Sequence, residues 1–142
     1  MHPGIMYALL GALVFGLWTV FHQQASKNIN NLFGAIIVSI TAVIVGGAIL
    51  FLSKTHQSTL IQNPKGILFA ILAGICALGI DYFALKSYSS GLQISLSGPI
   101  IIGGSIAIAS TIGFFLGDSV TLIKILGLVL IIAGSALLAA QG

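Results

Sequence analysis

Five long apolar runs dominate this sequence, and each is about as long as a helix that crosses a lipid bilayer. A crossing helix needs about 20 residues, because each residue advances 1.5 Å through roughly 30 Å of hydrocarbon. The runs are continuous and lack the alternation of short strands that a membrane barrel would show. The sequence therefore predicts an all-α integral membrane bundle of five transmembrane helices. The expected spans are residues 4–21, 32–52, 66–85, 93–116 and 120–140.

The composition indicates that lipid, rather than water, surrounds these helices. Only 5% of the 142 residues are charged and 58% are hydrophobic, and the mean hydropathy is +1.18. A soluble domain carries about 25% charged residues, since water does not tolerate a largely apolar surface. The lysines are scattered along the chain, so no basic patch for nucleic acid is expected. With Cys76 as its single cysteine, the chain cannot form an internal disulfide.

Short connections between the runs leave no room for a soluble domain, so residues 1–142 are expected to form a single transmembrane domain. The first run lacks the basic region and the cleavage site of a signal peptide, and is expected to be a permanent helix. Asn63-Pro64 favours a turn and then a new helix start. With the N-terminus inside, Lys54, Lys65 and Lys124 lie inside and Lys27 and Lys86 outside, a bias thin enough to allow insertion in both directions.

The last three runs carry a series of short motifs. These are Tyr82-Phe83-Ala84-Leu85-Lys86, then Ser95-Leu96 followed by Pro99, then Phe115-Leu116-Gly117-Asp118-Ser119, and finally Gly127 with Ile131-Ile132-Ala133-Gly134. In order and spacing they resemble the drug/metabolite transporter superfamily, specifically its EamA-like domain, from about Gly66 to the end. The first two runs fit that domain only in length and in the aromatic Trp18. The chain departs from the family pattern at Asp118, where glutamate is usual, and at Asp81, to which no family role transfers.

The resemblance implies a secondary-active transporter that moves a small organic solute, a metabolite or a drug-like molecule, by alternating access. Many relatives have ten helices from two such domains, so this chain looks like the short bacterial or archaeal type, a multi-pass protein of the plasma (cell inner) membrane. A single half must pair with another copy, and an antiparallel homodimer is expected. Two alternatives stay open: a flippase of a lipid-linked substrate, and a non-transporting accessory subunit. No enzyme activity, cofactor or metal site is expected, and the chain has no P-loop.

Asp81 is the leading candidate for coupling transport to an ion. A charge inside a span costs on the order of a few kcal/mol, so it indicates a function or a local partner. Ala77 and Gly74 precede it on the same helix face, which predicts that Asp81 points into the bundle. Such a carboxylate could carry a proton or pair with a cation. The alternative is a hydrated acid near the far membrane interface, or one tied to a lysine.

Further candidates for contact with substrate lie near the ends of the runs. Lys86 follows Asp81 by five residues, a poor spacing for an intrahelical pair, so it is either a substrate contact or a snorkelling interfacial lysine. Trp18, Tyr82 and His22 either line a cavity or belong to the belt at the membrane interface. Gln93 and Ser95 add hydrogen-bonding groups to the fourth run.

Helix packing and helix ends give three more predictions. Pro99 removes a backbone donor and, with Gly98, Gly103 and Gly104, predicts a hinge that either lines a cavity or is an ordinary kink. Asp118 is predicted to cap the last helix, because an acid accepts the terminal amides. Small residues four apart predict seams between helices. These rows are Gly4, Ala8, Ala12 and Gly16, and Gly66, Ala70 and Gly74.

Overall fold

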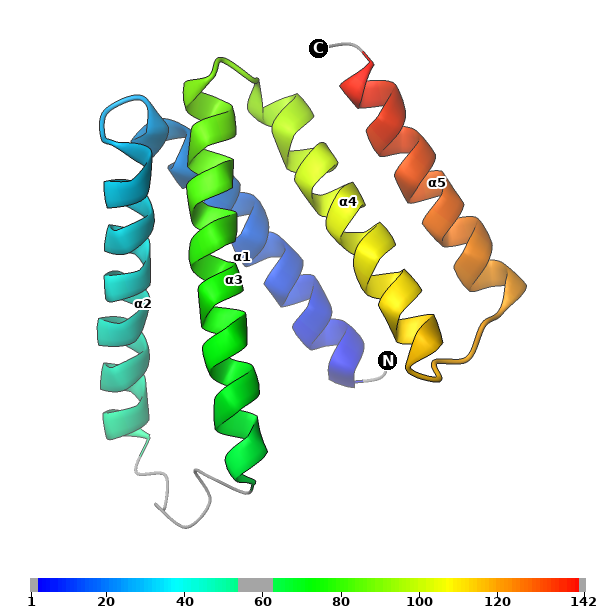
Figure 1. Cartoon of the computed structure of the whole chain (residues 1–142), viewed down its shortest axis with the longest axis horizontal. Coiled ribbons are helices and arrows are strands. Elements are labelled where there is room, and N and C mark those ends of the chain that lie inside the picture. The colour runs from blue at the N-terminus through cyan, green and yellow to red at the C-terminus, as the bar shows by residue number, and fades with distance from the viewer. Residues whose placement is uncertain (1–2, 54–62, 141–142) are drawn as a thin grey trace. The chain divides into compact units, whose positions relative to one another are not determined.

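Every regular element in the described part of the chain is an α-helix. The computed structural model describes residues 3–53 and 63–140. The helices are α1 (Pro3–Ser26), α2 (Asn31–Leu52), α3 (Pro64–Ser89), α4 (Ile94–Phe115) and α5 (Leu122–Ala139), as Figure 1 shows. All five are long and apolar enough to cross a membrane. The predicted all-α class with five membrane-spanning helices is confirmed.

Two helices extend beyond the ends predicted for them. Helix α1 continues to Ser26 rather than residue 21, and α3 continues to Ser89 rather than residue 85. The predicted ends followed the last apolar residues, whereas backbone hydrogen bonding continues through the polar residues that come next. Asp81 therefore lies eight residues before the end of α3, which corresponds to about 12 Å along the helix axis.

The chain divides into two compact units, and each is described by itself. One runs from Phe21 to Ser89, and the other combines the residues up to Val20 with those from Ser90 onward. In the first, here called the α2–α3 unit, α2 packs along α3; in the second, the α4–α5 unit, α4 packs along α5 (Figure 1). That both form a single transmembrane domain stays a prediction.

A glycine allows the two helices of each unit to approach closely. At Gly34 of α2, an added Cβ would lie 2.9 Å from Cδ1 of Leu85 in α3. At Gly103 of α4, an added Cβ would overlap the hydroxyl group of Ser135 in α5. Helices in lipid associate through such close contacts rather than through exclusion of water.

The predicted small-residue seams use other glycines. Gly16, Gly66 and Gly74 have open space where a Cβ would stand. These positions therefore make no close contact within the described part of the chain, and their role as seams stays a prediction.

Asparagine side chains accept hydrogen bonds from backbone amides at the start of two helices. Asn30 is the N-cap of α2, and its Oδ1 accepts hydrogen bonds from the amides of Leu32 at 3.0 Å and Phe33 at 3.2 Å. Asn63 precedes α3, and its Oδ1 accepts from the amide of Lys65 at 2.9 Å. The helix start predicted from Asn63 and the proline after it is confirmed.

The start of α5 corrects one prediction. The N-cap is Thr121, whose Oγ1 accepts a hydrogen bond from the Lys124 amide at 3.3 Å. Asp118 lies further upstream, in a turn where Gly117 has a φ of +100°, a conformation that favours glycine. Its amide donates to the Gly113 carbonyl of α4 at 3.0 Å. The predicted capping role of Asp118 is wrong, because the helix begins at Leu122 and not at residue 120.

Candidate functional site

A buried contact between a histidine and an acid joins α1 to α3 within the α2–α3 unit. Nε2 of His22 lies 3.2 Å from Oδ1 of Asp81, and the two side chains are only 4% and 10% exposed. Removing a charge from water is costly, and a partner at hydrogen-bonding distance offsets much of that cost. The α2–α3 unit therefore holds two titratable groups in direct contact away from water.

Helical spacing explains why Asp81 is buried. Asp81, Ala84, Leu85 and Tyr88 follow one another at intervals of three, one and three residues, and all four are buried. On the other side of the helix, Ile80 and Phe83 are 48% and 67% exposed and are available to lipid.

The prediction that Asp81 points inward is confirmed, although its buried neighbours differ from those expected. Ala77 and Gly74, which were expected to share the inward face, are exposed in the described structure. The inward face is made by the residues that follow Asp81 in α3, not by those that precede it.

A cavity of about 360 Å³ lies between the start of α2 and Tyr82 of α3. It is lined by Asn30, Asn31, Leu32 and Tyr82, the last of which is the neighbour of Asp81 in the chain. Nδ2 of Asn31 donates to Ser89 Oγ at 2.9 Å, which ties the start of α2 to the end of α3. The cavity therefore offers amide and phenol groups between the start of α2 and α3, and neither His22 nor Asp81 lines it.

A cation stands close to the phenol of this cavity. Nζ of Lys86 lies 5.7 Å from the centre of the Tyr82 ring, within the range of a cation–π contact. Lys86 itself is exposed, as a snorkelling lysine would be. Its position therefore fits both predictions made for it, an interfacial lysine and a contact for substrate.

The predicted site residues fall into two groups. His22, Asp81, Tyr82 and Lys86 all belong to the α2–α3 unit, and the structure places the first two in contact and the last two in contact. The others belong to the α4–α5 unit, and their roles stay predictions. Trp18 stacks on Phe15 with ring centres 5.0 Å apart, Gln93 is the N-cap of α4 without a side-chain cap bond, and Ser95 is exposed in the first turn.

The predicted hinge lies inside an unbroken helix. Helix α4 runs from Ile94 to Phe115 with Pro99 within it. Gly98 and Gly103 are buried and Gly104 is exposed. The close contact of Gly103 with Ser135 explains this glycine by helix packing. The hinge therefore stays a prediction.

The sequence did not predict that His22 pairs with Asp81. The two residues are on different helices, and no short spacing connects them. The scarcity of titratable residues was the signal that could have found this pair, because the chain has only two acidic residues and three histidines. An acid buried inside a span needs a donor or a cation, and a histidine at the end of another span is able to supply either.

The five spans and the interior polar pair define a multi-span membrane protein. A family model described as the EamA-like transporter family matches residues 2–140. The chain belongs to this family, which is part of the drug/metabolite transporter superfamily, and it is a membrane transporter. The predicted resemblance is confirmed.

Two relatives differ in how much of their length this chain covers. An uncharacterized protein of Methanocaldococcus jannaschii is 31% identical over 141 residues, which are 97% of this chain and 97% of that protein. An uncharacterized transporter of Clostridium kluyveri is 28% identical over 139 residues, which are 93% of this chain and 42% of that protein. No solved structure matches the chain.

Proposed function

We propose that this chain is a proton-coupled, secondary-active transporter of a small organic solute. It would work by alternating access as an antiparallel homodimer in a bacterial or archaeal plasma membrane. The observation that carries the coupling is the contact of His22 with Asp81 at 3.2 Å inside the α2–α3 unit. Histidine is the side chain whose charge changes most readily near neutral pH, and a carboxylate beside it forms a pair that is able to hold a proton.

Tyr82 is the residue through which a solute would act on this pair. Tyr82 lines the cavity and directly follows Asp81 in α3, whereas Asp81 itself does not line it. A solute bound against Tyr82 would act on Asp81 through the α3 backbone and so change its contact with His22. Linkage then requires that bound solute and bound proton change each other's affinity by the same factor.

The cavity is consistent with a small solute. A volume of about 360 Å³ is within the range of binding sites for small organic molecules. The Oδ1 atom of Asn31 is buried without a hydrogen-bond partner, so a solute that donates a hydrogen bond would satisfy it. The Tyr82 ring adds a flat surface for an apolar or aromatic part of the same molecule.

The C. kluyveri relative supports a working unit of two copies. This chain matches 42% of that transporter, so two chains of this size correspond to one of its chains. Transporters made of two inverted halves bind substrate between the halves, and an odd number of spans inverts the second half. The open space at Gly16 and Gly74 would admit the close approach of a second copy.

Proteoliposomes that contain only this chain and a trapped pH-sensitive dye test the transport proposal. Amino acids, nucleosides, sugars and small aromatic amines are added outside in turn. We expect at least one class to change the internal pH with the wild type and none to do so with Asp81→Asn. Lys65→Gln, which removes an exposed charge far along α3 from the pair, is the control and should behave like the wild type. Solute uptake by the wild type without any pH change would overturn the coupling.

Orientation tagging tests the antiparallel dimer. Cys76 is replaced by alanine, a cysteine is placed at residue 142, and intact cells are treated with a membrane-impermeant maleimide. Insertion in both directions predicts that about half of the molecules react, because the positive-inside bias is weak. Labelling of all molecules or of none would exclude the antiparallel arrangement.

A further inference from the structure

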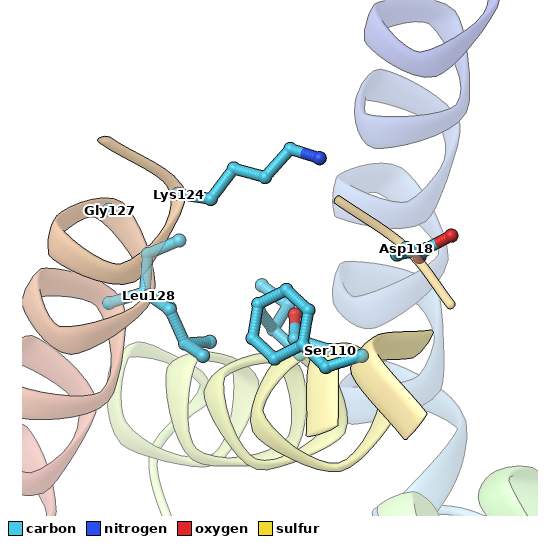
Figure 2. Close-up of a pocket in the computed structure, with 8 residues that line it drawn as sticks. Ser110, Asp118, Lys124, Gly127 and Leu128 are labelled. Atoms are coloured by element: carbon cyan, nitrogen blue, oxygen red, sulfur yellow. The ribbon is translucent and has the colours of Figure 1, made fainter. Parts of the chain in front are cut away.

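A second cavity lies in the α4–α5 unit, and the transport proposal gives it no role. Its volume is about 350 Å³, and Figure 2 shows the side chains around it. Phe114, Leu128 and Ile131 contribute apolar walls, and Asp118 and Lys124 contribute opposite charges. A molecule that fills this cavity should therefore be partly apolar and should carry both a positive and a negative charge.

Lys124 makes one edge of the cavity positive. Its Nζ donates to the carbonyl oxygen and to the hydroxyl oxygen of Ser119, both at 2.8 Å, so one of the three ammonium hydrogens remains for a ligand. Lys124 belongs to the first turn of α5, which contains no acidic residue. Since the start of a helix carries a partial positive charge, the lysine and the helix end both attract an anion.

Asp118 makes another edge of the cavity negative. Its Oδ2 lies over Gly113, where an added Cβ would come within 2.6 Å of it, so the missing side chain makes room for the carboxylate. Asp118 follows the end of α4, whose last turn contains no basic residue. Because the end of a helix carries a partial negative charge, the carboxylate and the helix end both attract a cation.

The two charges do not neutralise each other directly. Among residues 3–53 and 63–140, the contact within 4.0 Å between an acidic and a basic side chain is that of Asp81 with His22, and Asp118 and Lys124 do not form one. Figure 2 shows their side chains at separate edges of the cavity, with Ser110 and Leu128 also lining it. Separate poles of opposite sign are complementary to a zwitterion, with its anionic group at Lys124 and its cationic group at Asp118.

The apolar walls favour a lipid as the zwitterion. Leu128 and Ile131 belong to a membrane-spanning helix, and Ile131 is exposed where acyl chains would contact it. Asp118 lies in the turn that joins two such helices, and turns of this kind reach the level of the lipid headgroups. We propose that this cavity binds a phospholipid of the phosphatidylethanolamine type, with the phosphate at Lys124 and the primary ammonium at Asp118.

Lipid retention by the purified wild-type protein tests this proposal without any mutation. The chain is reconstituted with equal amounts of dioleoyl phosphatidylethanolamine, phosphatidylcholine and phosphatidylglycerol, extracted in detergent and analysed by native mass spectrometry. We expect the protein to retain about tenfold more phosphatidylethanolamine than either competitor. Its primary ammonium group can donate charge-assisted hydrogen bonds to Asp118, and the two competitors cannot. Phosphatidylcholine has no ammonium hydrogen to donate, and phosphatidylglycerol has no cation.

Variants then assign the two poles. Asp118→Asn should abolish the preference for phosphatidylethanolamine over phosphatidylglycerol, and Gly113→Ala should do the same by displacing the carboxylate. Lys124→Gln should lower the retention of all three lipids. Lys27→Gln, which removes an exposed lysine from the other unit, should leave both the preference and the retention unchanged.

Two results would overturn the proposal. Equal retention of the three lipids by the wild type would show that the cavity does not select a zwitterion with a primary ammonium group. Displacement of the bound lipid by phosphoethanolamine, the headgroup without its tails, at a similar concentration would show that the site takes a soluble zwitterion and that the apolar walls do not select a lipid.

Discussion

The two units of this chain use their few charged residues in opposite ways. In the α2–α3 unit, His22 and Asp81 are buried and contact each other across two helices. In the α4–α5 unit, Asp118 and Lys124 are exposed, and Lys124 is held by the oxygens of a turn. A charge in a low-dielectric interior needs a direct partner, whereas one at a turn is stabilised by water and the local backbone. We propose that the interior pair serves transport and that the turn charges serve recognition at the membrane surface.

The largest difference should come from removing an acid in each unit. Asp81→Leu leaves His22 buried without this carboxylate, and we expect the free energy of unfolding in detergent to fall by about 3 kcal/mol. The double variant His22→Phe/Asp81→Leu should recover most of the loss, because both polar partners are then replaced by apolar groups.

Asp118→Leu is the matched variant in the α4–α5 unit. Because Asp118 is exposed, its replacement should change the free energy of unfolding by no more than about 0.5 kcal/mol. SDS titration of the folded protein measures both losses of unfolding free energy. Equal losses for the two acids would contradict the distinction between a paired interior charge and a solvated one.

Glycine packing should give the next largest effect. Gly103→Ala places a Cβ 2.6 Å from Ser135 Cβ, an atom that cannot move without its helix, and should cost about 2 kcal/mol. Gly34→Ala meets only the ends of Leu85 and Ile29, which are able to rotate, and should cost about 1 kcal/mol.

A rescue and a control make this comparison sharper. The double variant Gly103→Ala/Ser135→Gly should restore thermal stability, since it removes the obstructing atoms. Gly104→Ala, at a position with open space, should lower the melting temperature little. If Gly104→Ala is as harmful as Gly103→Ala, the loss comes from helix α4 itself and not from its contact with α5.

Helix caps should give the smallest effect. Asn30 accepts two amide hydrogen bonds, and Asn30→Ala should cost about 1 kcal/mol. Thr121 accepts one at 3.3 Å, and Thr121→Ala should cost about 0.5 kcal/mol. Amide hydrogen exchange in the first turns of α2 and α5 measures both. Faster exchange at the start of α5 in Asp118→Asn than in Thr121→Ala would contradict the assigned cap.

Much of the fold could be predicted because span length and hydropathy report directly on lipid. The helix ends were harder to predict from the sequence. Ser26 and Ser89 are polar residues within helices, because backbone hydrogen bonds continue where apolar side chains stop. Asp118 and Thr121 are both good capping residues, and only the backbone path through the turn at Gly117 shows which one begins α5.

The candidate site was predicted only in part, for a different physical reason. Asp81, His22, Tyr82 and Lys86 stand out in the sequence because polar residues are scarce near lipid-spanning runs. Which of them meet depends on how α1, α2 and α3 pack, and that information is not local. The contact of His22 with Asp81 and the position of Asn31 beside Tyr82 therefore required the structure.

Solute accumulation against its gradient tests the central claim, that the His22–Asp81 pair couples transport to protons. Vesicles containing the purified chain are given an inward proton gradient and a radiolabelled solute from the responsive class. The wild type should concentrate the solute inside. Asp81→Asn should still exchange internal for external solute but should not concentrate it, because no proton is carried through the pair. Accumulation by Asp81→Asn equal to that of the wild type would contradict the account.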